Sequence, residues 1–129
     1  MKKILFLIVL FAIFSCKNNS DSKEKAADST TVVKDEIKKD AENQKGLEIV
    51  TNNDCATCHR VDEKIQGPSY RDIANKYAAM PDTVIDHLAN KIIHGGSGVW
   101  GEIAMAPHPA LNETDAKEVV KYILSLKNK

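Results

Sequence analysis

The pentapeptide Cys55-Ala56-Thr57-Cys58-His59 decides how this chain folds. Its two thiols stand three positions apart, so each can add across one vinyl group of a haem, and the next residue is a histidine that would then lie under the iron. A Cys-x-x-Cys-His string is typical of c-type haem attachment. The sequence therefore predicts one haem c, bound covalently through Cys55 and Cys58, with His59 as an axial ligand of the iron.

Other uses of a cysteine pair compete with this interpretation. A thioredoxin-like redox pair would need a βαβ context, which the pattern lacks. Structural zinc takes four ligands at finger-like spacing, and the chain has no second pair of cysteines. A haemless thiol or disulfide protein is the remaining alternative.

The sixth ligand of the iron determines what the haem does. Methionine opposite histidine gives an electron-transfer centre with a raised potential, whereas an open position favours ligand binding. Met105 ends a glycine-rich stretch, and Pro107 restricts the residue before it to an extended backbone. We predict Met105 as the ligand and expect Met80 to be a loop or packing residue. His108, three residues beyond Met105, is the alternative ligand.

The spacing of apolar residues in the rest of the folded region predicts helices. No stretch alternates with period two, so we expect an all-α domain without a sheet. Aromatic residues make up only 5% of the chain, and a domain of under 90 residues is marginal by burial alone, so it needs a staple or a cofactor. The predicted helices run over about 40–51 with Asp40 as the cap, after Pro68 with Ser69 as the cap, from Pro81-Asp82 to Gly95-Gly96, and after Asn112.

The N-terminus has the composition of an export signal. Lys2 and Lys3 precede the apolar run 4–14, which is shorter than the roughly 20 residues that span a bilayer. The string Ile13-Phe14-Ser15-Cys16 resembles the lipobox of bacterial lipoproteins. We predict a lipoprotein signal peptide over residues 1–15, lipidation of Cys16 and an extracytoplasmic, membrane-anchored protein. An ordinary signal peptide and an uncleaved anchor are the alternatives.

A polar tract follows the signal. Lys, Asp, Glu, Ser, Asn and Thr dominate it, so it buries too little surface to offset its ordering entropy. We therefore predict a flexible tether over residues 16–40 and a compact domain over 41–129. In the alternative, the tract from Val32 onward extends the first helix.

Four strings in fixed order resemble a known family. They are CATCH at 55–59, Gly67-Pro68-Ser69-Tyr70, Gly98-Val99-Trp100-Gly101 before Met105, and the closing helix with Tyr122. From Lys45 to Leu126 the chain resembles the short bacterial class I cytochromes c, of the c-551/c-552 kind. The resemblance implies a small class I cytochrome c fold, with about four helices around one covalently attached haem.

The resemblance also implies roles for single residues. His59 and Met105 become the axial ligands, and the Pro68 carbonyl orients the His59 ring. Trp100 packs on the haem edge with its indole N–H toward a propionate. Gly46 lets the first helix cross close to the last, where Tyr122 packs. The chain departs from the best-known members after Met105, where Ala106-Pro107-His108-Pro109 replaces a continuation of Pro-Pro-Asn.

The expected function is one-electron transfer in an extracytoplasmic respiratory chain. The donor would be a quinol-oxidising complex and the acceptor a terminal oxidase or reductase. We expect a monomer and no enzyme, because no set of catalytic acid, base and nucleophile is visible. Basic and acidic residues balance at 18 each, which argues against a nucleic-acid partner. A haem-based sensor or small-gas binder with a labile Met105 is the alternative.

Overall fold

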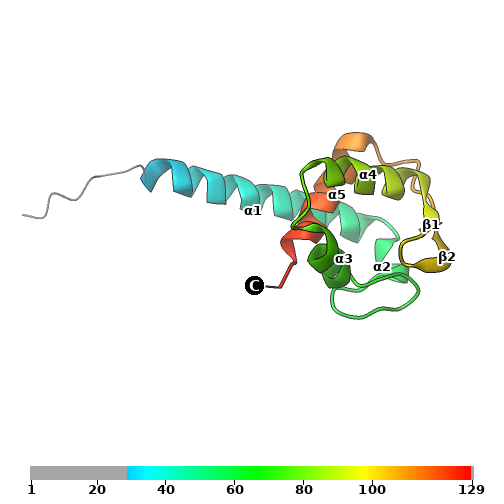
Figure 1. Cartoon of the computed structure of the whole chain (residues 1–129). Helices are drawn as coiled ribbons and strands as arrows, with labels where there is room; N and C mark the ends of the chain where they lie inside the picture. Colours follow the sequence, from blue (N-terminus) through cyan, green and yellow to red (C-terminus); the bar gives the residue numbers. More distant parts are fainter. Residues whose placement is uncertain (1–28, 129) are drawn as a thin grey trace, which may run out of the picture.

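The computed structural model describes residues 29–128, with side chains from residue 36 onward. Within that range no helix is both long enough and apolar enough to cross a membrane. The elements, shown in Figure 1, are α1 (Ser29–Asn52), α2 (Cys55–Cys58), α3 (Tyr70–Tyr77), α4 (Thr83–His94), β1 (Gly96–Gly98), β2 (Gly101–Met105) and α5 (Glu113–Ser125).

Helix α5 forms the centre of the domain, because α1, α3 and α4 all pack against it. Its buried positions recur at the spacing of one helical face: Ala116, Val119, Val120 and Ile123. They share a core with residues of the three surrounding helices: Val50, Tyr70, Ala89 and Ile92. The predicted helical fold class is confirmed.

Local sequence signals set most of the helix ends. The Ser69 hydroxyl accepts a hydrogen bond from the Asp72 amide at 3.0 Å, which caps α3. The Asn112 side chain accepts from the Asp115 amide at 2.9 Å and caps α5. Helix α4 ends at Gly95, whose φ of 71° belongs to the left-handed region that glycine enters without strain. These predicted ends are confirmed.

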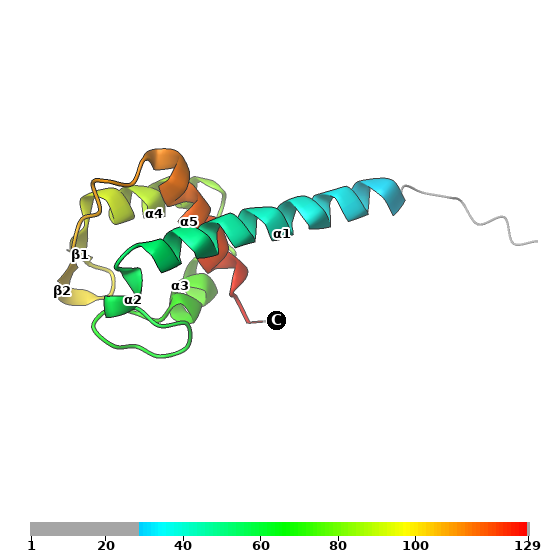
Figure 2. The same cartoon turned by 180° about the vertical axis from the view of Figure 1, so that it is seen from behind.

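Helix α1 begins eleven residues earlier than the sequence predicted. Residues 29–40, predicted as flexible, are helical and project from the domain in both views (Figures 1 and 2), and Asp40 is an exposed mid-helix residue rather than a cap. No glycine or proline occurs between Lys17 and Lys45. The packed half of α1 is already helical, so the residues before it only extend an existing helix. Extending a helix is far less costly in free energy than starting one. The predicted signal peptide, Cys16 and the rest of the tether lie outside the described residues.

The structure also contains a small sheet where none was predicted. Strands β1 and β2 form an antiparallel hairpin in which Gly96 pairs with Met105 and Gly98 with Gly101. Gly96, Gly98 and Gly101 all have positive φ, between 113° and 128°. The expectation of no sheet was wrong because these strands pair through glycine-rich backbone, which leaves no alternating side-chain pattern to detect.

Gly46 lies where α1 crosses α5. A Cβ at this position would collide with the carbonyl oxygen of Glu118 and the Cβ of Tyr122. The preceding residue, Lys45, pairs with Asp115 of α5 at 3.1 Å. The crossing therefore depends on the missing side chain, as the family resemblance implied.

Gly46→Ala tests this crossing. Alanine favours an isolated helix by about 1 kcal/mol, but here its methyl group meets the Glu118 carbonyl group and the Tyr122 Cβ, neither of which can rotate away. We expect a net loss of about 1–3 kcal/mol in the free energy of unfolding, measured by denaturant titration. Gln44→Ala, at an exposed position of the same helix, should change little. Equal stability of the two variants would contradict the close crossing.

Candidate haem site

The two motif cysteines occupy the single turn of α2, directly after α1. Both are free and partly buried, and the His59 amide closes the turn on the Cys55 carbonyl at 3.0 Å. Burial, reinforced by the charge of Asp54, raises the pKa of the Cys55 thiol. Among the described residues, no group of three or more His, Cys, Asp or Glu side chains could hold a metal ion.

A backbone carbonyl fixes the His59 ring. The Nδ1 atom lies 2.7 Å from the Pro68 carbonyl oxygen, and the residue is only 9% exposed. A carbonyl can only accept, so Nδ1 must donate and carry the proton. The Nε2 atom then holds a free lone pair, and it makes no hydrogen bond to any described residue. His59 is thus prepared to bind a metal through Nε2.

Two neighbouring residues, Tyr70 and Gly67, restrict the position of the imidazole ring. The Tyr70 ring stacks on it with centroids 5.6 Å apart and planes 18° from parallel. A Cβ on Gly67 would lie 2.8 Å from Nδ1 and 2.9 Å from Nε2, closer than real carbon contacts allow. Only glycine at position 67 leaves the ring in this place.

The loop that carries Pro68 is closed by backbone hydrogen bonds. Three amides from its far end donate to carbonyls beside the haem motif: Gly67 to Cys58 at 2.8 Å, Tyr70 to Arg60 at 2.9 Å and Arg71 to Val61 at 3.0 Å. The Pro68 carbonyl that contacts His59 therefore belongs to a loop whose two ends are hydrogen-bonded to each other.

Met105 ends the hairpin, which is fixed at its base. A Cβ on Gly95 would collide with the Met105 carbonyl oxygen and lie 3.0 Å from the Pro107 nitrogen. The His108 amide donates to the Ile92 carbonyl at 3.0 Å. The backbone around Met105 is therefore bound to the C-terminal end of α4. Met80, in contrast, lies 47% exposed in the connection between α3 and α4.

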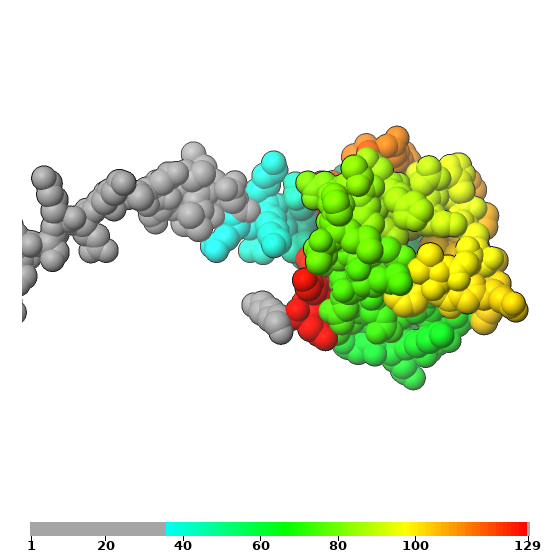
Figure 3. Space-filling view, viewed as in Figure 1, coloured from blue at the N-terminus to red at the C-terminus, as the bar shows by residue number. Residues whose placement is uncertain are grey.

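The tip of the hairpin is fixed as well. The Trp100 ring meets the Tyr77 ring edge-on at 6.3 Å, and the Lys76 ammonium lies 5.4 Å from the indole centroid. In the space-filling view the hairpin, in yellow, forms the end of the domain opposite the projecting helix (Figure 3). Met105 thus belongs to a hairpin that is attached at both ends.

The family model described as "Cytochrome c" matches residues 43–127. The chain belongs to the cytochrome c family. Cytochrome c-552 of Nitrosomonas europaea is 43% identical over 84 residues, which are 65% of this chain and 81% of the relative. Cytochrome c-551 of Azotobacter vinelandii is 40% identical over 82 residues, 64% of this chain and 98% of the relative. The predicted kinship to the short class I cytochromes is confirmed.

Solved structures confirm the predicted fold. The crystal structure of the wild-type Nitrosomonas europaea cytochrome c552 superimposes with a TM-score of 0.59 at 43% identity, and the match covers 63% of this chain and 99% of that one. The matched region of this cytochrome c binds one covalent haem c, and Cys55 and Cys58 are the thiols in the required arrangement with His59.

The residues around the cytochrome's motif suit a haem. The loop after α2 and the hairpin, which carry the two predicted ligands, expose large apolar side chains that are 37–67% accessible: Val61, Ile65, Val99, Trp100 and Ile103. The buried Tyr70 hydroxyl has no hydrogen-bond partner among the described residues, and burial raises its pKa so that it stays protonated. A largely apolar group would cover the exposed side chains and complete the core.

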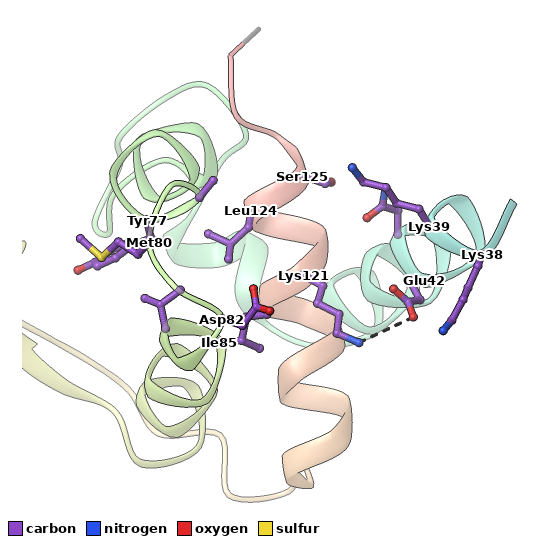
Figure 4. Close-up of a pocket in the computed structure, with 13 residues that line it drawn as sticks. Lys38, Lys39, Glu42, Tyr77, Met80, Asp82, Ile85, Lys121, Leu124 and Ser125 are labelled. Atoms are coloured by element: carbon purple, nitrogen blue, oxygen red, sulfur yellow. Dashed lines mark ion pairs between the residues drawn. The ribbon is translucent and has the colours of Figure 1, made fainter. Parts of the chain in front are cut away.

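Two hollows of the described surface lie elsewhere. The first, of about 420 Å³, lies between α1, the α3–α4 connection and α5, and it is crossed by the Lys121–Glu42 ion pair at 3.9 Å (Figure 4). The second, of about 450 Å³, lies where Val99 of the hairpin tip approaches the same connection. Neither is lined by the cysteines, His59 or Met105, so neither is the haem site.

Sequence reasoning missed the residues that hold His59 and Trp100 in place. Tyr70, Gly67, Lys76 and Tyr77 contact these residues but were not given such roles. The Gly67-Pro68-Ser69-Tyr70 string was the one available signal, and within it only Pro68 was given a role toward His59. Axial ligation by His59 and Met105, and the role of Trp100 at a propionate, stay predictions.

Gly67→Ala tests the support of the His59 ring. The added methyl would occupy the space of the imidazole, so the ring must turn away from the Pro68 carbonyl. We expect poorer haem incorporation and a changed reduction potential in the fraction that matures, read by haem-stained electrophoresis and redox titration. Lys64→Ala, in the exposed part of the same loop, is the matched control. If both variants behave as wild type, Gly67 does not hold the ring.

Proposed function

We propose that this cytochrome c carries single electrons with a haem iron ligated by His59 and Met105. Monohaem proteins of the family are electron carriers, and the described residues present no competing catalytic set. The observation that carries the ligation is the His59–Pro68 hydrogen bond, because it leaves Nε2 as the only ring nitrogen with a free lone pair.

The chain's residues restrain both sides of the iron. When bound, the haem supplies an iron that cycles between the ferric and ferrous states. His59 is held by Pro68, Gly67 and Tyr70, and Met105 by a hairpin fixed at its base and tip. Ligands that are held in place need little rearrangement between oxidation states, which suits rapid electron exchange.

Other side chains bind the haem or tune it. Thioethers from Cys55 and Cys58 retain it outside the cell, and the sulfur of Met105 favours the ferrous iron. The Trp100 indole N–H is the proposed donor to a propionate. The Lys91 ammonium lies near Gly96 at the start of the hairpin and adds positive charge there.

We propose an extracytoplasmic location and a lipid anchor at Cys16. The export-type N-terminus and the Ile13-Phe14-Ser15-Cys16 string support this proposal. A lipid raises the effective concentration of the haem domain near membrane partners without any new protein contact. The proposed donor is a quinol-oxidising complex and the proposed acceptor is a terminal oxidase or reductase.

Met105→Ala tests the sixth ligand. We expect loss of the far-red sulfur-to-iron band of the ferric protein and a drop in potential, within the roughly 0.8 V over which axial ligands set haem potentials. Met80→Leu is the matched control and should keep both properties. If Met105→Ala keeps the band, the ligation is wrong. If only His108→Ala changes the spectrum, His108 is the ligand and the histidine alternative holds.

Cys16→Ala tests the anchor. Without the thiol no lipid can be attached, so the mature, haem-containing protein should leave the membrane fraction and appear in the soluble extracytoplasmic fraction. Ser15→Ala, which keeps a small residue before the cysteine, should stay with the membranes. Continued membrane association of Cys16→Ala would contradict lipidation at this residue.

A further inference from the structure

Arg71 joins two distant segments of the chain beside the haem motif. Its guanidinium Nε pairs with the Asp62 carboxylate in the loop after α2. Its Nη1 donates to the Leu126 carbonyl at 2.7 Å. Leu126 is the C-terminal cap of α5, where carbonyl groups lack a partner within the helix. One side chain thus ties the haem-motif loop to the end of the central helix.

Apart from the backbone hydrogen bonds that close its two ends, the loop that Arg71 holds has little to fix it. Residues 61–66 are all exposed and belong to no helix or strand. Arg71 directly follows Tyr70, which stacks on His59, and its own amide donates to the Val61 carbonyl. Side chain and backbone of Arg71 therefore both attach the loop in which Pro68 meets His59.

The two contacts need a planar fork. Nε and Nη1 point to acceptors on different segments, and a guanidinium offers such donors in a fixed geometry, whereas the single nitrogen of lysine does not. The pairing also lowers the pKa of Asp62, chiefly through the hydrogen bond from Arg71. The carboxylate is therefore charged, and the tie intact, at neutral pH.

We propose that Arg71 is a positioning residue for the histidine side of the haem. By tying Asp62 to the end of α5, it keeps the Pro68 carbonyl on Nδ1 of His59. A carbonyl held firmly there makes the imidazole a stronger electron donor and stabilises the ferric iron. Loosening the tie should raise the reduction potential. The inference rests on the proposed ligation of iron by His59.

The test breaks the tie without changing the net charge. The double variant Asp62→Asn/Arg71→Leu removes one charge of each sign. Its control, Asp86→Asn/Lys117→Leu, breaks a pair that joins α4 to α5. The two pairs match in side-chain exposure, at 32% and 67% for Arg71 and Asp62 against 32% and 66% for Lys117 and Asp86. Arg71→Lys is a milder variant that keeps the charge and loses the fork.

We expect the Asp62/Arg71 variant to raise the potential and to speed exchange of the His59 Nδ1 proton in the reduced protein by about tenfold. Arg71→Lys should change both in the same direction, and the control should match wild type. Equal potentials and exchange rates in all four proteins, whatever their stabilities, would show that Arg71 only stabilises the fold. Wild-type behaviour of Arg71→Lys would likewise overturn the proposal, because charge alone would then suffice.

The wild-type protein separates the two proposals. Covalent haem with the far-red sulfur-to-iron band in the unmodified chain supports the proposed function before any variant is made. A wild-type chain without them would overturn the function itself. A normal wild type with unresponsive variants would overturn only the role of Arg71.

Discussion

The hydrogen bond between His59 Nδ1 and the Pro68 carbonyl is the constraint on which the haem site depends. It fixes the tautomer of the ring, because Nδ1 donates to the carbonyl and the free lone pair is left on Nε2. Every feature around it serves to keep the two groups together. Gly67 leaves room for the ring, Tyr70 supports its face, and three backbone hydrogen bonds close the loop.

Met105 is held in place by different contacts from those that hold His59. His59 is held by the buried end of a loop, at Pro68 and Tyr70, whereas Met105 belongs to an exposed hairpin that is attached to the end of α4 and, through Trp100, to α3. The hairpin buries few of its own side chains. Its position therefore depends on backbone contacts at the base and on the Lys76–Trp100–Tyr77 cluster at the tip, and a bound haem would add a third support.

The sequence predicted those features whose signals are local. The Cys55–His59 string, the caps Ser69 and Asn112 and the stop at Gly95 are each contained in a few residues. The hairpin was missed because glycine pairing leaves no alternation. The preferred prediction made α1 too short, and only the alternative of an extension from Val32 came near its length, because the charged tract was treated alone although the packed half of the helix supports it. Tyr70 acts through contacts that form only once the chain has folded.

Nuclear magnetic resonance of the reduced holoprotein with labelled histidines tests the central claim most directly. The structure predicts that the His59 ring proton resides on Nδ1 and shows coupling across a hydrogen bond to the Pro68 carbonyl carbon, while Nε2 carries no proton. A proton on Nε2, or a ring without coupling to Pro68, would contradict this account of how the chain prepares its histidine for the iron.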